Sequence, residues 1–432
     1  MLDIQFIRDN PEMVEEKAKQ KGYEVNIGEL LELDSERRTR LTQIEELRSR
    51  RNTQSSDIKN SPPTEEQISI GRQLKEELGQ REEELKTIDE KYGTLLKAVP
   101  NMPLDDVPVG STEDENVVAK KNGDIPEFGF TPKNHWEILE PLDMLDKERA
   151  AKISGSRFAY LKGDLVRLQL AIMQFVMQTL GDQTVIQKLI DENELHVSAK
   201  PFTPVLPPAL LRTEPYKASA RLNAEEVTYK IEQDDLWLNA SAEHTLCTMY
   251  WNETLPEEMF PIRYVGYSTS FRREAGTYGK DTEGMIRMHQ FDKLEMEVFS
   301  TPETGLDEHR LQVAIQEYLV RQIRLPYQVL QKCTFDIGKP NARGIDIETW
   351  FPGQNKYRET HTADFMTDYQ ARDLKIRVKR NQGGTDLVHT NDATAFALGR
   401  IMAAIVENYQ TADGRVRVPE VLKPFMGGQE TL

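Results

Sequence analysis

The sequence predicts an α+β protein in which an N-terminal antiparallel coiled-coil arm precedes a globular part that contains helices and a β-hairpin. Three observations predict this class. Apolar residues recur with heptad spacing within the first hundred residues. Near the middle of the chain, two segments of alternating polarity flank a loop rich in glycine, as in a β-hairpin. Apolar segments with helical periodicity lie on both sides of this hairpin, so helices can cover a sheet.

The composition excludes several classes of protein. The 432-residue chain has 55 Lys and Arg against 72 Asp and Glu, a formal net charge of −17. A general nucleic-acid-binding protein is therefore excluded, and any nucleic-acid contact has to come from a local basic patch. Two cysteines, Cys247 and Cys333, are too few for a disulfide scaffold or a cysteine-based zinc module. No segment predicts a membrane span or a signal peptide, so we expect a cytoplasmic protein without a membrane partner.

Residues 1–100 predict an N-terminal domain whose helical hairpin arm covers about residues 29–97. In its second helix, about 64–97, the seam positions alternate four and three residues apart, with Arg81 filling one slot among Leu74, Leu78, Leu85, Ile88, Tyr92 and Leu95. Residues 29–54 repeat the pattern less regularly. Pro62 and Pro63 lie between the two segments and favour a turn near residues 56–63. The second helix would be about 50 Å long.

Residues 101–125 are rich in Pro, Gly and Asp and predict a linker, and residues 126–432 predict a globular domain. Within this domain, residues 164–180 predict a buried helix and residues 394–410 a final helix. Thr394 and Arg400 would then lie near a helix N-terminus, which attracts anions. An ordinary capped core helix with one exposed arginine is the alternative.

The alternating segments 263–274 and 288–299 predict the β-hairpin. The two-residue period of a strand directs Leu294, Met296 and Val298 to one face of the second strand, and Phe291, Lys293, Glu295 and Glu297 to the other. Together with the first strand, one face of the sheet can present four side chains: Arg272, Glu274, Phe291 and Glu295. An arginine beside acids and an aromatic ring suits a ligand with a phosphate, an amine and a flat base. A solvated strand face is the alternative, and is common where charges alternate.

A second polar group follows, in which Glu359 and the hydroxyl of Thr362 offer oxygen ligands for Mg²⁺. An amphipathic strand with a wet basic face is the alternative, and the pattern alone favours it. The chain contains neither G-x-x-x-x-G-K-[ST] nor a G-x-G-x-x-G after a predicted strand, so both of these nucleotide-binding loops are excluded.

Taken together, these segments resemble the seryl-tRNA synthetases, a family of class II aminoacyl-tRNA synthetases, over nearly the whole chain. The similar segments are MLDIQFIRDNPE (1–12), the arm, KISGSRFAYLKGD (152–164), PVLPPALL (204–211, motif 1), FRREAGTYGKDTEGMIRMHQFDKLE (271–295, motif 2), PGQNKYRE (352–359), TDYQAR (367–372) and ATAFALGR (393–400, motif 3). The resemblance implies a class II antiparallel sheet flanked by helices and a homodimer. It implies ATP-dependent ligation of L-serine to tRNA(Ser) through a seryl-adenylate, and leaves open whether tRNA(Sec) is also serylated.

The resemblance also assigns residues to the site. The serine pocket would contain Ser241, Ala242, Glu243, Arg272, Glu295 and Thr394. The ATP site would contain Arg272, Arg273, Glu274, Arg287, Met288, Phe291, Glu359, Thr360, His361, Thr362 and Arg400. Arg272 and Arg400 are the implied catalytic residues because they offset phosphate charge, and Glu359 and Thr362 are the implied Mg²⁺ ligands.

A basic stretch in the first helix of the arm is the candidate tRNA contact. It consists of Arg37, Arg38, Arg40, Arg48, Arg50 and Arg51, against Glu45 and Glu46. We expect salt-dependent contact with RNA phosphates there. Simple solvation of the helix by charged residues is the alternative.

Four segments differ from the family pattern. ASARLNAEE (218–226) replaces a loop that contains Gly-Thr-Gly, THTADF (360–365) replaces a Ser-Ser-Cys-Ser-Asn run, Asn391-Asp392 replaces Leu-Asn, and Asp373 replaces a second arginine. The charged site positions are intact, so we expect an active enzyme.

Two other functions stay open. One is a paralogue that adenylates another small amino acid or charges a carrier protein, which the retained arm argues against. The other is a non-catalytic coiled-coil or RNA-binding regulator.

Overall fold

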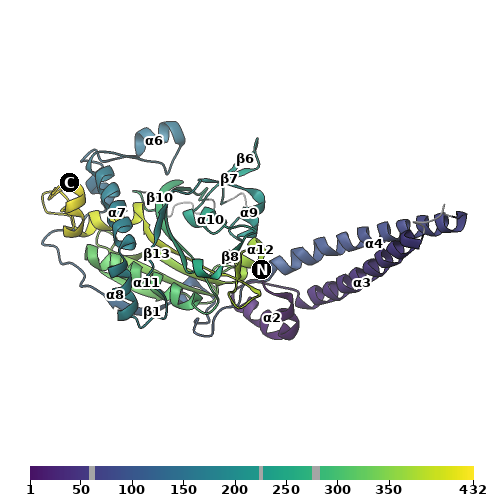
Figure 1. Cartoon of the computed structure of the whole chain (residues 1–432). Helices are drawn as coiled ribbons and strands as arrows, with labels where there is room; N and C mark the ends of the chain where they lie inside the picture. Colours follow the sequence, from purple (N-terminus) through teal and green to yellow (C-terminus); the bar gives the residue numbers. More distant parts are fainter. Residues whose placement is uncertain (58–63, 223–226, 275–282) are drawn as a thin grey trace. The chain divides into compact units, whose positions relative to one another are not determined.

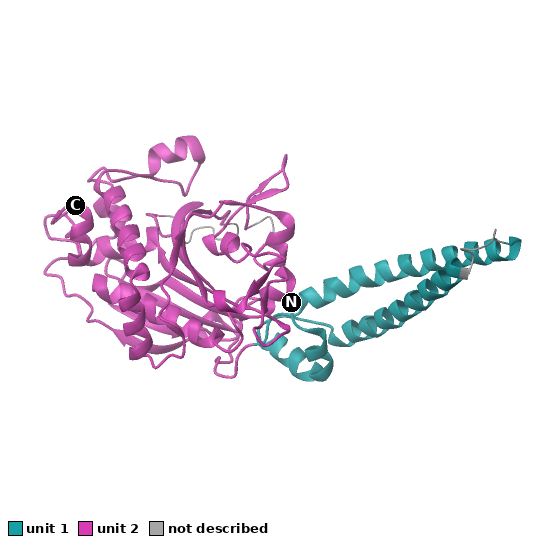
Figure 2. Ribbon diagram, viewed as in Figure 1, with its two compact units in different colours: residues 1–102 teal, residues 103–432 magenta. Residues whose placement is uncertain are grey.

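Figure 1 shows the computed structural model of the chain, which describes every residue except 58–63, 223–226 and 275–282. Most of the predicted tip of the arm, most of the predicted hairpin loop and the end of the segment 218–226 therefore lie outside the described residues. The chain divides into two compact units, Met1–Met102 and Pro103–Leu432 (Figure 2). Their boundary lies close to residue 100, where the sequence predicts the end of the N-terminal domain.

The first unit consists of two short helices and a long helical hairpin. The short helices are α1 (Ile4–Asp9) and α2 (Pro11–Gln20), and the hairpin consists of α3 (Ile27–Asp57) and α4 (Glu65–Ala98). The apolar seam meets between the two long helices, where Leu85 packs against the buried side chains of Ile44, Leu47, Leu74 and Leu78. The predicted coiled-coil arm is confirmed.

Polar contacts fix both ends of the arm. At the start of α4, the Thr64 hydroxyl accepts a hydrogen bond from the Gln67 amide (3.2 Å), and the Gln67 side chain accepts one from the Thr64 amide (2.9 Å). This capping box satisfies two N–H groups that the helix itself leaves free. At the base of the arm, the buried carboxylate of Asp34 accepts bonds of 2.8 and 2.9 Å from Arg8. The helix α1 therefore positions the start of α3.

The second unit is built on an eight-stranded sheet in the order β1-β11-β12-β13-β16-β10-β9-β4. Neighbouring strands pair antiparallel, except that β4 pairs parallel with β9. In that order the strands are Val117–Asn122, Tyr327–Gln331, Arg343–Phe351, Lys356–Thr367, His389–Ala397, Gln290–Ser300, Ile262–Phe271 and Thr203–Val205. The edge strand β1 lies inside the segment 101–125, so part of the predicted linker belongs to the sheet.

Smaller elements complete this unit. Within the described residues, short strands form three further sheets. One pairs β2 (Leu145–Asp146) with β3 (Tyr160–Leu161), and a second has the order β5 (Leu210–Arg212), β7 (Leu236–Leu238), β6 (Lys230–Ile231). The third has the order β15 (Thr385–Leu387), β14 (Arg377–Lys379), β8 (Thr254–Pro256). The α-helices are α5 (His135–Leu139), α6 (Lys147–Ser154), α7 (Asp164–Gly181), α8 (Gln183–Glu192), α9 (Thr213–Ala218), α10 (Ala242–Leu246), α11 (Gly305–Ile323), α12 (Tyr369–Leu374) and α13 (Leu398–Asn408). Short 3-10 turns cover Glu113–Glu115, Glu257–Met259 and Glu420–Met426.

Helices cover one face of the main sheet and leave the other for polar groups. Figure 1 shows α7, α8 and α11 together on one side. Leu294, Met296 and Val298 of β10 are buried in the core with apolar residues of these helices. Because strand side chains alternate, Lys293 and Glu295 project from the opposite face. The predicted division of β10 into an apolar and a charged face is confirmed.

One predicted element begins later than expected. The sequence predicts a helix from Thr394, whereas residues 389–397 form β16 and α13 begins at Leu398. The reason is tertiary pairing, because β16 lies between β10 and β13 and both pair with it. Thr394 is therefore a strand residue opposite Glu295, and Arg400 is the third residue of α13.

The predicted helix 164–180 is confirmed as α7. Among the described residues, no helix is both long and apolar enough to cross a membrane.

Candidate active site

A polar cavity lies on the charged face of the sheet, where β10, β13 and β16 meet the start of α13. Ten of its lining residues are sequence-predicted site residues: Arg272, Glu274, Arg287, Met288, Phe291, Glu359, Thr360, Thr362, Thr394 and Arg400. Five further lining residues were not predicted as site residues: Met285, Ile286, Lys293, Ala397 and Gly399. The cavity thus brings together residues that are more than a hundred positions apart in the chain.

Irregular strand pairing explains why these side chains converge. The register between β10 and β16 shifts after Leu294, so that Glu295 lies opposite Thr394. A second shift between β12 and β13 leaves Thr360 as an extra residue beside Glu359. Such bulges redirect side chains and are frequent next to active sites. Gly399 completes the arrangement, because a Cβ there would lie 2.6 Å from the Met285 carbonyl oxygen.

One end of the cavity carries arginines and an aromatic ring. The guanidinium of Arg272 lies 5.2 Å from the centre of the Phe291 ring, and its Nε donates to the Ala240 carbonyl oxygen at 3.1 Å. Arg400 Nη1 lies 2.8 Å from Glu359 Oε1. A flat base and a polyphosphate match this combination of an aromatic ring and two guanidinium groups.

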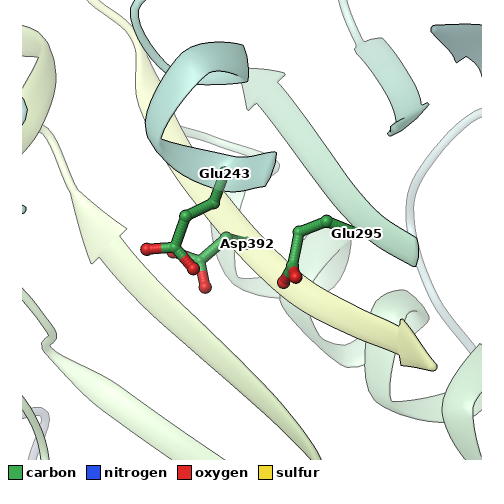
Figure 3. A group of neighbouring side chains, drawn as sticks. All are labelled: Glu243, Glu295 and Asp392. Carbon is green, nitrogen blue, oxygen red and sulfur yellow. The ribbon is translucent and has the colours of Figure 1, made fainter. Parts of the chain in front are cut away.

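A group of buried carboxylates lies next to Lys293, beyond the residues that line the cavity, and forms the other end of the site. Figure 3 shows the side chains of Glu243, Glu295 and Asp392 directed toward one another from α10, β10 and β16, and their oxygens lie within 4.8 Å of one another. Ser241 Oγ donates to Glu295 Oε2 at 3.2 Å, and Lys293 Nζ lies 2.5 Å from the same oxygen. Burial raises the pKa of the Glu295 carboxyl to about 7, although the Lys293 ammonium favours the charged form.

Lys293 connects the two ends, because it lines the cavity and also contacts Ser241 and Glu295. Arg221 is a second cation that was not predicted as a site residue. Its Nε lies 2.7 Å from Glu243 Oε1, and its Nη2 donates to Asp392. One signal could have identified it: Arg221 and Asp392 lie in two of the segments that depart from the family pattern, and the two departures have opposite charge.

Two predicted ATP residues lie elsewhere. His361 is buried, with its ring 5.2 Å from that of Phe396 and its Nδ1 2.8 Å from Thr360 Oγ1. Strand alternation turns Thr360 and Thr362 into the cavity and His361 toward the core. The guanidinium of Arg273 lies 6.0 Å from the Tyr229 ring centre, and Arg273 does not line the cavity. The structure therefore does not support ATP contacts by these two side chains. Ala242 is the buried first residue of α10, beside Ser241 and Glu243.

Comparisons with known proteins agree with this geometry. The family model for the seryl-tRNA synthetase N-terminal domain matches residues 1–103, and the model for the class II tRNA synthetase core domain (G, H, P, S and T) matches residues 228–409. A serine--tRNA ligase of Thermodesulfovibrio yellowstonii is 39% identical, with 99% of both chains covered. One of Exiguobacterium sibiricum is 37% identical over the full length of both chains.

Solved structures give the same result. A seryl-tRNA synthetase from Pyrococcus horikoshii, complexed with ATP, matches 100% of this chain and 99% of its own with a TM-score of 0.85 and 36% identity. A cytoplasmic serine-tRNA ligase from Naegleria fowleri, in complex with AMP, matches 100% of this chain and 98% of its own with a TM-score of 0.83 and 28% identity. The predicted class II fold is confirmed. The chain therefore belongs to the seryl-tRNA synthetase family, and its activity is the ATP-dependent ligation of serine to tRNA.

Proposed function

We propose that the cavity over β10, β13 and β16 is where this chain activates L-serine with ATP before transfer to tRNA(Ser). One observation carries the proposal: the arginines and the aromatic ring that suit a nucleotide line the same cavity as Lys293, which contacts the buried Ser241 and Glu295. Nucleotide and amino acid can then be held side by side, as a reaction between them requires.

At the nucleotide end, Phe291 stacks on adenine and Glu274 accepts a hydrogen bond from its amino group. Arg272 and Arg400 hold phosphates, Arg272 the α-phosphate and Arg400 the γ-phosphate. A carboxylate oxygen of serine attacks the α-phosphorus, the bond to the bridging oxygen breaks, and pyrophosphate leaves. The guanidinium groups offset the charge that develops, and no side chain becomes covalently attached.

At the amino-acid end, Glu295 receives the α-ammonium of serine. A carboxyl whose pKa is raised by burial gains most from a cation at this position. Ser241 and Thr394 are the polar partners of the serine side chain. A site that forms hydrogen bonds with a hydroxyl rejects alanine strongly, because its own polar groups would be left without partners.

Mg²⁺ fits the same cavity, because the carboxylate of Glu359 and the hydroxyl of Thr362 both line it and both are oxygen ligands. These two residues would hold the ion. When bound, Mg²⁺ would neutralise part of the polyphosphate charge. Arg400 pairs with Glu359 and so helps to hold this carboxylate in the lining of the cavity.

For tRNA, we propose contact along α3 of the arm. Three of the six arginines form ion pairs with acids of α4: Arg37 with Asp89 at 2.6 Å, Arg40 with Glu84 at 3.4 Å and Arg48 with Glu82 at 2.7 Å. A fourth, Arg38, pairs with Asp34 of α3. Arg50 and Arg51 are exposed and form no ion pair within the described residues. These two are the strongest candidates for phosphate contacts. Serylation of tRNA(Sec) stays a prediction.

Two further parts of the proposal are a homodimer and a cytoplasmic location. The segment 204–211, which resembles motif 1, leaves apolar side chains at the surface: Leu206 is 77% exposed and Leu210 is 38% exposed. Exposed apolar groups beside an edge strand favour pairing with a second copy.

Pyrophosphate exchange with serine, threonine, glycine and alanine tests the amino-acid assignment, and charging of tRNA(Ser) tests the second step. Serine should support the fastest exchange. Preference for another amino acid would favour the adenylating paralogue, and absence of ATP turnover with every amino acid would favour the non-catalytic regulator.

A further inference from the structure

Two residues that depart from the family pattern contact each other at the amino-acid end of the cavity. Arg221 comes from the segment 218–226, and Asp392 stands where the family has Asn. The Nη2 of Arg221 donates to Asp392, and its Nε lies 2.7 Å from Glu243. The exposed fractions of the side chains are 15% for Arg221, 9% for Glu243 and 2% for Asp392, so the contact is shielded from water.

The buried acids at this end outnumber the cations. Asp364 pairs in register with Asp392 between β13 and β16, and Glu297 follows Glu295 on the same face of β10; both are buried. Within the described residues, Arg221 forms ion pairs with Glu243 and Asp392, and Lys293 forms one with Glu295. Burying a charge without a partner is strongly unfavourable. Arg221 is the group that makes Asp392 compatible with its position beside Glu243.

Acceptor oxygens remain unused after these contacts. Within the described part of the chain, Asp392 Oδ1 and Glu295 Oε1 are buried and have no hydrogen-bond partner. An amino acid with a hydroxyl and an ammonium supplies the missing donors. Burial raises the pKa of the Asp392 carboxyl, and the Arg221 guanidinium favours its charged form. In that form Asp392 can only accept, whereas the amide of the family pattern can also donate.

We infer that Arg221 is a positioning residue for the amino-acid subsite, which holds Glu243 and Asp392 together and leaves Asp392 Oδ1 as an acceptor for the substrate. The inference rests on the proposed function, because it takes this subsite to be where serine binds. It predicts that Arg221 acts on serine and not on ATP, and that its effect depends on the charge at position 392.

The inference about Arg221 is tested by serine-dependent pyrophosphate exchange in the full-length chain. Three variants are compared with the wild type: Arg221→Met, Asp392→Asn and the double variant. Arg221→Met should raise the KM for serine about 10–100-fold, as expected when a buried charge loses its partner, and leave the KM for ATP within about threefold. The double variant should have a KM for serine between those of the wild type and Arg221→Met, because Glu243 still lacks its guanidinium partner but position 392 no longer carries an unpaired carboxylate.

Arg380→Met is the matched control. Arg380 pairs with Glu257, Glu303 and Asp386, and its side chain is 17% exposed, similar to Arg221. Its loss should change neither KM. Arg221→Gln also removes the charge, and replaces Arg221→Met in the cycle if that variant fails to fold.

Equal changes in both KM values, additive effects in the double variant, or an unchanged KM for serine in the Arg221 variant would each overturn the inference. The wild-type assay separates a failure of the inference from a failure of the proposed function. If the wild type shows no exchange with serine, the proposed function fails and the inference with it. If the wild type is active and the Arg221 variant is indistinguishable from it, the inference alone fails.

Discussion

Replacing Arg272 by alanine tests the catalytic assignment most directly. A guanidinium about 4 Å from a phosphate charge, at the effective dielectric constant of about 20 that suits a half-buried site, is stabilised by roughly 4 kcal/mol. Removing one donor from a transition-state contact typically costs about 3–4 kcal/mol. Water can enter the space left by the truncated side chain, so we expect the lower end, about 3 kcal/mol. That corresponds to roughly a 100-fold loss in rate.

The measurement is kcat/KM for serine-dependent pyrophosphate exchange, and the neighbouring Arg273→Ala is its control. The two residues have the same charge and adjacent positions, but Arg273 lies over Tyr229 outside the cavity. We expect the Arg273 variant to stay within threefold of the wild type. If both variants lost activity equally, or if the Arg272 variant kept more than a third of the wild-type value, the assignment of Arg272 to the phosphate would be wrong.

Three other perturbations separate the functions of the two units. Replacing both Arg50 and Arg51 by glutamate should raise the KM for tRNA about tenfold and flatten its dependence on salt, without changing pyrophosphate exchange. The raised pKa of Glu295, about 7, means that the charged form needed for the serine ammonium is lost as pH falls. The KM for serine should therefore rise below about pH 7 in a pH titration of the exchange reaction, and a KM that is flat between pH 6 and 8 would contradict this. Leu78→Ala should lower the stability of the arm by about 2–4 kcal/mol, seen as an earlier melting transition, and leave exchange intact.

Periodicity predicted the elements whose partners are close in sequence. The heptad seam predicted both arm helices, and the two-residue period predicted which side chains of β10 lie on its polar face. It did not predict the start of α13, because Ala393, Ala395 and Ala397 suit a helix as well as a strand and only the pairing with β10 and β13 decides between them. Lys293 was placed on the polar face, but its contact with Glu295 depends on geometry that a pattern of residues does not contain.

The pairing of Arg221 with Asp392 marks the limit of sequence reasoning. The two residues are 171 positions apart, and no spacing or composition relates them. Each appears in the sequence as an isolated departure from the family pattern, and the charge at position 392 looks unfavourable for a nucleotide site. The structure shows how the charge is accommodated, because the side chains of Arg221 and Asp392 contact each other in a buried position. The favourable interpretation of Asp392 depends on Arg221, and neither departure can be interpreted without the other.

Burial of charge alone would not have identified this site. Arg263 and Glu308 form another buried ion pair, with two bonds of 2.8 Å, on β9 and α11. In that pair the guanidinium and the carboxylate satisfy each other, and such a pair contributes structure at a cost in desolvation. At the amino-acid end the cations do not satisfy all the acceptors, and Glu295 and Asp392 each keep a free oxygen within the described residues. Buried acceptors without donors are costly, and under the proposed function the ammonium and hydroxyl groups of serine would supply donors to these two oxygens.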